Sequence, residues 1–337
     1  MKSLFLYLIK DPNVQGTRLA GLTPLEWLMR GAGDIPYRVI GAEAEILPAE
    51  GCDYLAMLYE STPLVRAEDL YALAEEIELR GADGISIGRG RLQKTEAFLR
   101  GWQPKRRCAA SFATEISRAE NLFSAERTLY RRNAEKSAQN GAIIPDPEAV
   151  RIDAHSTVEA GVILEPYVSV TRSVLRKGAR IGSFSEVENS EIGEDAVLSR
   201  SVVKDSRIGA GATVGPFAYI RMDSEIGKGC RIGDFVEVKR STLEEGVKAA
   251  HLTYIGDASV GAKTNVGCGT VFANYDGKEK HRTEVGRSVF IGANANLVAP
   301  LSIGDGAYIA AATTVTKEVA AGAFVIGRVR AEEKKRE

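Results

Sequence analysis

One histidine in the chain stands where its side chain could do acid–base chemistry. His251 lies within residues 248–256 (KAAHLTYIG), and the 337-residue chain has only three histidines. An imidazole titrates near neutral pH, so it can take a proton from an ammonium group. His251 also lies just before a slip in the six-residue period of the chain, where Ile255 and Val260 stand five residues apart instead of six. On spacing alone it could also be a surface histidine without a role, and that alternative stays open.

Basic side chains gather in the same part of the sequence. Arginine and lysine on neighbouring turns of a repetitive fold can together hold a phosphate group. The basic residues are Arg221, Lys239, Arg240, Lys263, Lys278, Lys280 and Arg282. The alternative is that they only form a solvated charged surface. Polar residues also stand among apolar neighbours at Asn265, Asn274 and Tyr275. Because asparagine is common in tight corners, those three decide nothing by themselves.

Metal and disulfide chemistry have little support in the sequence. No Cys-x-x-Cys pair exists, since the cysteines are Cys52, Cys108, Cys230 and Cys268. The other two histidines, His155 and His281, are far from His251 in sequence. We therefore expect no metal site. Free, mostly structural thiols in a reducing compartment are the simplest interpretation.

A six-residue repeat sets the elements that would position these residues. Aliphatic residues, several followed by glycine, recur at Ile208, Val214, Ile220, Ile226, Ile232 and Val238, and again at Val285, Ile291, Leu297, Ile303, Ile309 and Val315. This period predicts a parallel β-helix in which each hexapeptide makes one strand and one corner. Such coils wind left-handed, against the usual crossover preference. An antiparallel β-sandwich is disfavoured, because strict alternation with turn signals is absent.

The repeat is interrupted once by a polar segment. Residues 271–284 (VFANYDGKEKHRTE) carry no aliphatic–glycine pair. We expect them to project from the β-helix as a loop, which is a natural place for binding residues.

The first part of the chain has a different pattern. Strands are predicted at 3–9, 37–40 and 54–59, and helices at 23–29, 67–79 and 95–101, which indicates a small α/β layer structure. A long charged helix follows at 117–139 and ends at Gly141. We therefore expect an α/β domain at 1–115, a linker helix at 116–141, a β-helix domain at 142–328 and a charged tail at 329–337.

Composition excludes several classes of protein. Forty-four basic residues against 45 acidic ones give a net charge of −1, which argues against a general nucleic-acid binder. A hydrophobic content of 44% and a charged content of 26% are those of a globular protein, without a membrane span or extended disorder. The first ten residues lack a cleavage site for a signal peptide. We expect a cytoplasmic protein.

Several segments resemble the acetyltransferase part of one bacterial family. The family is the bifunctional N-acetylglucosamine-1-phosphate uridyltransferase/glucosamine-1-phosphate acetyltransferase (GlmU), and the resemblance covers roughly residues 115–328. The matching segments are 215–218 (GPFA), 234–239 (DFVEVK), 251–257 (HLTYIGD), 273–277 (ANYDG), 297–300 (LVAP) and 313–316 (TTVT). Hexapeptide repeats alone are shared by many acyltransferases, whereas the HLTY and NYDG segments at this spacing are specific.

The resemblance implies a role for each matching residue. His251 falls on the catalytic base. The positions that hold the sugar phosphate are Arg221, Lys239, Tyr254, Asn265 and Lys280. The positions that contact acetyl-CoA, the co-substrate, are Asn274, Tyr275, Ala293, Ala311 and Arg328. At one of these the family has serine and this chain has Ala293, which removes a hydrogen bond worth about 1 kcal/mol. The sequence also ends nine residues after Arg328, before the family's usual tail, so we expect weaker acetyl-CoA binding.

The uridyltransferase part of the family is poorly matched. Residues 11–18 (DPNVQGTR) keep only the end of the family's glycine-rich nucleotide loop, and Val14 replaces a glycine. Glu60 and Ser61 stand where the family has a metal-binding Gly-Asp pair, and Ala119 stands for an asparagine ligand. The resemblance therefore implies a truncated, degenerate nucleotidyltransferase-like domain. We expect no magnesium site and no uridyl transfer.

The resemblance therefore implies an acetyl-CoA-dependent N-acetyltransferase acting on glucosamine 1-phosphate, in the biosynthesis of UDP-N-acetylglucosamine. The family arrangement implies a homotrimer whose sites lie between neighbouring β-helices. No nucleic-acid or membrane partner is expected. Three alternatives stay open: an acyltransferase for another amino sugar, a non-catalytic binding or regulatory relative, and a still bifunctional enzyme.

Overall fold

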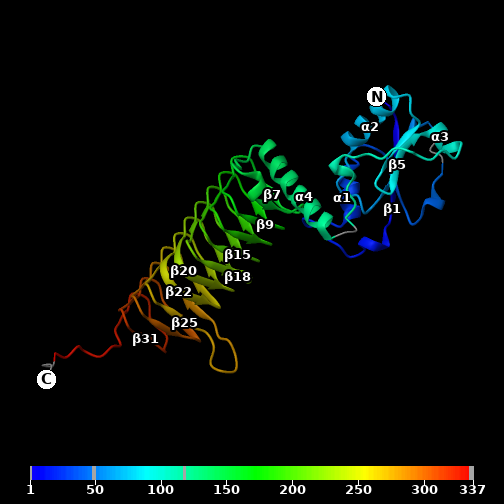
Figure 1. The fold of residues 1–337 in the computed structure, drawn as a ribbon. Coiled ribbons are helices and arrows are strands. Elements are labelled where there is room, and N and C mark those ends of the chain that lie inside the picture. The colour runs from blue at the N-terminus through cyan, green and yellow to red at the C-terminus, as the bar shows by residue number, and fades with distance from the viewer. Residues whose placement is uncertain (1, 48–50, 117–118, 334–337) are drawn as a thin grey trace, which may run out of the picture. The chain divides into compact units, whose positions relative to one another are not determined.

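The chain folds into two compact units. The computed structural model describes residues 2–47, 51–116 and 119–333, and its internal contacts separate Met1–Arg132 from Asn133–Glu337 (Figure 1). This division falls within the predicted linker segment 116–141. Residues 117–118 of that segment and 334–337 of the predicted tail lie outside the described residues, as do 1 and 48–50 of the predicted first domain.

The first unit is built on a mixed sheet. Among the described residues its strand order is β2-β1-β3-β5-β4, with β1, β2 and β3 parallel and β5 antiparallel to both β3 and β4. The strands are β1 Leu4–Ile9, β2 Tyr37–Ile40, β3 Tyr54–Tyr59, β4 Gly84–Ile87 and β5 Gly90–Lys94. The first three match the prediction. The hairpin of β4 and β5 was not predicted, because its strands are short and rich in glycine.

Helices pack on this sheet through apolar faces. They are α1 Pro24–Gly31, α2 Ala67–Leu79 and α3 Thr95–Leu99. A capping box begins α1: the Glu26 amide donates to the Thr23 hydroxyl at 3.2 Å, and the Thr23 amide donates to the Glu26 carboxylate at 2.7 Å. The long helix α4, Ala119–Gln139, ends just before Gly141, whose φ of +97° suits a residue without a side chain.

The second unit is a left-handed parallel β-helix with three faces (Figure 1). The first face holds β6 Arg151–Ile152, β9 Ser169–Thr171, β12 Glu186–Glu188, β15 Val202–Lys204, β18 Tyr219–Arg221, β25 Val271–Ala273, β28 Asn296–Val298 and β31 Thr314–Val315. The second holds β7 Thr157–Val158, β10 Val174–Leu175, β13 Glu191–Ile192, β16 Arg207–Ile208, β19 Glu225–Ile226, β21 Thr242–Leu243, β23 Ala258–Val260, β26 Thr283–Val285 and β29 Leu301–Ile303. The third holds β8 Ile163–Leu164, β11 Arg180–Ile181, β14 Val197–Leu198, β17 Thr213–Val214, β24 Asn265–Val266, β27 Phe290–Ile291, β30 Tyr308–Ile309 and β32 Phe324–Val325.

The six-residue repeat fills the inside of this β-helix. Its aliphatic residues, such as Val214, Ile220 and Ile226, are buried in one continuous core. Burying one such side chain stabilises the fold by about 1.5–3 kcal/mol. At one corner, hydrogen bonds between serines join neighbouring coils. The backbone amide of each serine donates to the side-chain hydroxyl of the serine one coil earlier. We call this set the serine column, Ser156, Ser173, Ser190, Ser206, Ser224 and Ser241.

Two strands depart from the regular pattern. β20 Arg231–Lys239 and β22 Lys248–Gly256 run from the third face to the first through a corner without a break, and they pair along most of their length. The predicted loop 271–284 is shorter than expected, because its ends form β25 and β26 and bury Phe272 and Thr283. The segment that projects, 274–282, leaves the coil between those strands (Figure 1).

Candidate functional site

The unbroken corner of β20 and β22 carries the predicted base. Asp234 is paired in register with His251, one coil later. Gly233 allows this close approach, because a Cβ atom there would overlap the carbonyl group of Ala250. The local sequence therefore brings the corner of β20 directly under the corner of β22.

His251 and Asp234 form a hydrogen-bonded pair. The Nδ1 atom of His251 lies 2.8 Å from Oδ1 of Asp234. Hydrogen bonding to His251 is the largest cause of a lowered pKa for Asp234, so this carboxyl group is ionised at neutral pH. The pair is open to solvent in a single chain, with 59% of the His251 side chain and 40% of the Asp234 side chain exposed. This arrangement leaves Nε2 of the imidazole available to accept a proton.

Positive side chains gather on the first face, at the other end of the same strands. Arg221 and Lys239 are register partners on β18 and β20. Hydrogen bonding to the ammonium of Lys280, on the projecting loop, is the largest cause that lowers the pKa of Lys239 to about 8, and desolvation adds to it. The positive charges of Lys280, Arg240 and Arg221 act in the same direction. We call Arg221, Lys239 and Lys280 the cationic group, whose crowded charges favour binding of an anion.

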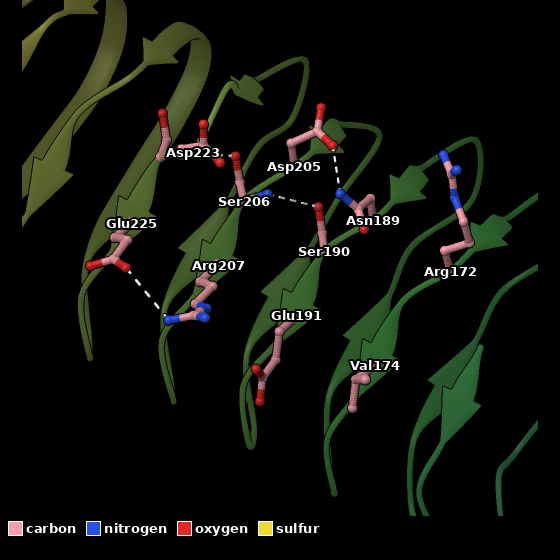
Figure 2. Close-up of a pocket in the computed structure, with 11 residues that line it drawn as sticks. Arg172, Val174, Asn189, Ser190, Glu191, Asp205, Ser206, Arg207, Asp223 and Glu225 are labelled. Carbon is pink, nitrogen blue, oxygen red and sulfur yellow. Dashed lines mark hydrogen bonds and ion pairs between the residues drawn. The ribbon is translucent and has the colours of Figure 1, made fainter. Parts of the chain in front are cut away.

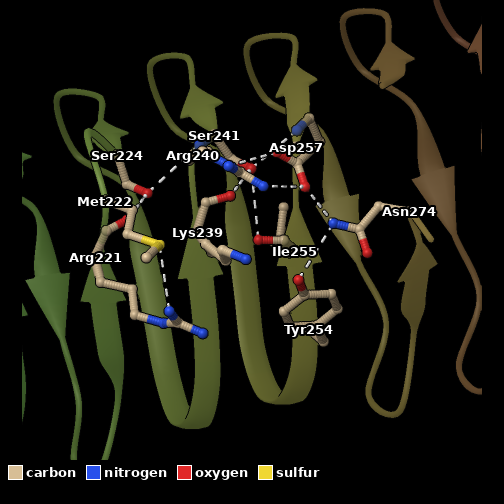
Figure 3. A network of polar contacts seen from close by, with 11 residues as sticks. Arg221, Met222, Ser224, Lys239, Arg240, Ser241, Tyr254, Ile255, Asp257 and Asn274 are labelled. Atoms are coloured by element: carbon tan, nitrogen blue, oxygen red, sulfur yellow. Dashed lines mark hydrogen bonds and ion pairs between the residues drawn. The ribbon is translucent and has the colours of Figure 1, made fainter. Parts of the chain in front are cut away.

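A polar network borders the cationic group (Figure 3). Arg240 donates to the Asp257 carboxylate from Nε at 2.7 Å and from Nη2 at 3.3 Å. The buried amide of Asn274 donates to that carboxylate and, at 3.3 Å, to the Tyr254 hydroxyl. Arg221 is held in turn by Glu237, whose Oε1 accepts from Nη2 at 2.6 Å. The network fixes the start of the projecting loop to the first face through Asn274.

Other predicted site residues are placed elsewhere in the single chain. Asn265 lies on the third face, paired with Lys248 and Phe290, away from the cationic group. Tyr275 is exposed and donates to the Gly277 carbonyl at 2.8 Å within the projecting loop. One chain therefore brings together Arg221, Lys239, Tyr254, Asn274 and Lys280, but not Asn265.

The remaining predicted acetyl-CoA positions follow the corner that begins at His251. Towards the C-terminus, the next coils place small or exposed residues at this corner, among them Cys268 and then Ala293. The Ala312 amide donates to the Ala293 carbonyl at 2.8 Å, which puts Ala311 one coil further. Arg328 closes the row, donating to the Ala311 carbonyl at 2.7 Å. Between His251 and Arg328, the successive coils therefore carry small side chains at this corner.

Sequence reasoning missed two acidic residues of this site. In the sequence, Asp234 and Asp257 stand out only as members of segments that match the family. Asp234 precedes His251 by 17 residues, which is one coil of the β-helix. A strict six-residue repeat gives a coil of 18 residues and would place Asp234 beside Leu252, so the partner of His251 becomes visible only once the 17-residue length of this coil is known.

In the first unit, residues of the segment 11–18 line a cavity of about 390 Å³. Gly16, Thr17 and Glu60 are among its lining residues. Asp11 is buried there and accepts from Nη1 of Arg89 at 2.8 Å. Among residues 2–47, 51–116 and 119–333 no group of three or more His, Cys, Asp or Glu is arranged to hold a metal ion.

Another cavity, of about 380 Å³, lies on the β-helix (Figure 2). Its lining includes Asn189, which donates to Asp205 at 2.7 Å, and the ion pair of Arg207 with Glu225. None of its lining residues is a predicted site residue, so it adds nothing to the site around His251. No helix in the described part of the chain is both long and apolar enough to cross a bilayer.

Comparisons with known proteins agree with the repeat and with the resemblance. Residues 205–240 match the bacterial transferase hexapeptide (six repeats) family. The proteins named "Bifunctional protein GlmU" of Clostridium acetobutylicum and Caldanaerobacter subterraneus are 44% and 45% identical over 210 and 212 residues, each alignment covering 62% of this chain and 46% of the relative. The chain thus spans about half the length of these curated relatives.

Among solved structures, an Arabidopsis UDP-N-acetylglucosamine acyltransferase is 16% identical, with a TM-score of 0.34, over 53% of this chain and 67% of that one. The sequence relatives and the hexapeptide match point to a transferase. Over about 210 of its residues, then, this chain is a homologue of the proteins named Bifunctional protein GlmU, and its β-helix carries the bacterial transferase hexapeptide repeat.

Proposed function

We propose that the chain is an acetyl-CoA-dependent N-acetyltransferase that converts glucosamine 1-phosphate to N-acetylglucosamine 1-phosphate. The observation that carries this proposal is the hydrogen-bonded pair of His251 and Asp234, because β20, which carries Asp234, also carries Lys239 of the cationic group. Acetylation of a phosphorylated amino sugar needs these two parts: a base for the ammonium group and cations for the phosphate. The similarity to the GlmU proteins supports the same substrate class.

In the proposed reaction His251 acts as general base. Its Nε2 takes one proton from the ammonium group at C2 of the sugar, and the freed amine attacks the carbonyl carbon of the thioester. The C–N bond forms, the C–S bond breaks, and the electron pair leaves with the sulfur of coenzyme A. A proton from the attacking nitrogen ends on that sulfur or in solvent. The cationic group holds the phosphate, which raises the effective concentration of the amine at the thioester.

We further propose that the working form is a homotrimer. Lys239 lies five residues beyond Asp234 on β20, a span of up to about 17 Å for an extended strand. A base from one copy and the cationic group of a second copy would bring the two parts closer. An exposed apolar ridge supports such packing: it lies on one corner and comprises Tyr167, Phe184, Phe217, Phe235 and Leu252, each between 52% and 64% exposed.

For the first unit we propose that uridyl transfer has been lost. By the resemblance, Val14 stands at a glycine position of the nucleotide loop, and its side chain is buried. A residue with a side chain there does not allow the close backbone approach to phosphate that glycine allows. Glu60 and Ser61 replace the expected metal-binding pair. Incubation of the protein with UTP, N-acetylglucosamine 1-phosphate and magnesium is expected to release no pyrophosphate. Release at an enzymatic rate would show that the chain is still bifunctional.

The main test is release of coenzyme A from acetyl-CoA in the presence of glucosamine 1-phosphate. We expect His251→Ala to lower kcat by about 100-fold or more, the usual contribution of a general base. His155→Ala, elsewhere on the β-helix, is the matched control and should leave the rate unchanged. Glucosamine without the phosphate should be a much poorer acceptor. A folded wild-type protein that releases no coenzyme A with any amino sugar would contradict the proposal and favour a binding role.

A further inference from the structure

We propose that Asp234 is a positioning residue for His251, whose carboxylate holds the imidazole in the tautomer that carries its proton on Nδ1 and its lone pair on Nε2. This inference rests on the proposed function, because it assigns a role to a group that acts through the base. Its first test is a measurement that does not depend on catalysis.

The chemistry of the pair selects one tautomer. An ionised carboxylate only accepts hydrogen bonds, so at 2.8 Å the Nδ1 atom of His251 must be the donor. The lowered pKa of Asp234 agrees with a carboxylate that stays ionised at neutral pH. In a neutral imidazole the remaining nitrogen, Nε2, then carries the lone pair, and a general base needs that lone pair.

The backbone holds both members of the pair in place. Asp234 and His251 are paired in register within the nine-residue strands β20 and β22. The buried hydroxyl of Thr253 donates to the His251 carbonyl at 2.8 Å and fixes the strand just after the corner. Because Gly233 admits close contact with Ala250, the carboxylate reaches the imidazole without displacing either strand.

The pair has little to do with stability. With 59% and 40% of the two side chains exposed, water screens the interaction strongly. An exposed pair of this kind adds little to folding, so replacing Asp234 should lower the melting temperature by no more than about 2–4 °C. What the pair does supply is a fixed ring orientation and a fixed tautomer, and both matter only if Nε2 has a task.

Nitrogen NMR of the full chain labelled with ¹⁵N-histidine reads the tautomer directly. The chain has three histidines, so His251→Ala assigns the His251 signals by their loss. We expect the neutral ring of the wild type to show a protonated Nδ1 and an unprotonated Nε2. Asp234→Ala should shift this pattern towards the other tautomer, whereas Asp234→Asn, which keeps an acceptor oxygen, should preserve most of it.

Kinetics give the second readout. Asp234→Ala should lower kcat about tenfold or more with little change in KM for the acceptor, because the cationic group is untouched. Asp234→Asn should restore most of that loss. The double variant Asp234→Ala/His251→Ala should be no slower than His251→Ala alone, since Asp234 acts only through the imidazole. Glu225→Gln, which removes an exposed ion-paired carboxylate on β19, is the control and should not change kcat.

The outcomes separate this inference from the proposed function. An unchanged tautomer pattern in Asp234→Ala would overturn the positioning role, whatever the enzyme does. Equal kcat values for Asp234→Ala and wild type would overturn it as well. If the wild type releases no coenzyme A at all, the proposed function fails, and the tautomer measurement still decides whether Asp234 sets the state of His251.

Discussion

At the scale of single residues, the site is organised by like charges that are kept close together. The charges that most affect the pKa of Lys239 are those of Lys280, Arg240 and Arg221, and all three are positive. Such crowding is unfavourable in the free protein, and a bound phosphate dianion would relieve it. Phosphate binding and the position of the projecting loop, which carries Lys280, should therefore depend on each other.

This crowding predicts how acceptor binding depends on pH. The pKa of Lys239 is lowered to about 8, so its charge is present below that pH and lost above it. We expect KM for glucosamine 1-phosphate to rise about tenfold between about pH 7 and about pH 9, the size of one charged hydrogen bond. Initial rates at varied acceptor concentration would measure this change.

Variants of the projecting loop test the cause of that pH dependence. In Lys280→Met the repelling ammonium is gone, so the rise in KM should move to higher pH, although affinity at neutral pH should be lower. Lys278→Met removes a neighbouring loop charge that is not among the main causes of the lowered pKa of Lys239, so it should keep the wild-type profile. Identical profiles for the two variants would contradict the account.

The sequence could predict only part of this site. His251, Lys239 and Lys280 stand out by residue type and by resemblance to a family. Asp234 and Asp257 do not, because aspartate is common at corners and its partner lies a whole coil away. Asn265 and Tyr254 are separated because they lie on different faces of the β-helix. The sequence does not show which face each residue occupies, because the repeat slips by one residue before residue 260.

At the scale of elements, the serine column replaces side-chain packing with hydrogen bonds. Ser206 is buried, donates to the Lys204 carbonyl at 2.7 Å and accepts from the Ser224 amide at 3.3 Å. A serine is small enough for a tight corner and satisfies two backbone groups at once. The six-residue repeat predicted the strands correctly, but it says nothing about what joins one corner to the next. The glycine-rich β4–β5 hairpin was missed for a similar reason, since its identity depends on pairing with β3.

Replacing one member of the column should weaken the β-helix measurably. Ser206→Ala leaves a buried amide and a buried carbonyl without their partner, which should cost about 1–3 kcal/mol of unfolding free energy. Urea unfolding followed by circular dichroism measures this cost. Ser183→Ala removes an exposed hydroxyl that donates to Glu165 and should change stability by less than about 0.5 kcal/mol. Equal effects of the two variants would show that the column is not a stabilising element.

At the scale of the whole molecule, the apolar ridge is the surface through which the proposed trimer would complete the site. Its residues occupy equivalent corner positions, with Arg200 at that corner on the coil between Phe184 and Phe217. Phe217 stacks on Phe235 with ring centroids 5.5 Å apart. Exposed aromatic side chains in such a row are typical of contact surfaces between proteins. The ridge ends at Leu252, next to His251, so packing of a second copy there would close the open side of the base.

Disrupting the ridge should therefore affect assembly and activity together. We expect light scattering of the wild type to give about three times the chain mass of 36.3 kDa, and Phe217→Asp to give a smaller species with little coenzyme A release. Tyr308→Asp changes an exposed aromatic residue on the third face and should remain a trimer. A fully active Phe217→Asp monomer would contradict the shared site.

The coil geometry also gives the β-helix a constant rise for each coil. Each coil advances the chain by one strand spacing, about 4.8 Å, whatever its surface residues are. Asn189 and Asp205 occupy equivalent corners, so joining Asn189 to Ser206 would delete one coil and keep the register of the serine column. The distance along the β-helix axis from the first coil to His251 would then fall by about 4.8 Å, and the residues around His251 would stay the same. The number of coils thus sets how far His251 lies from the first coil, whereas the few residues around His251 set the proposed chemistry.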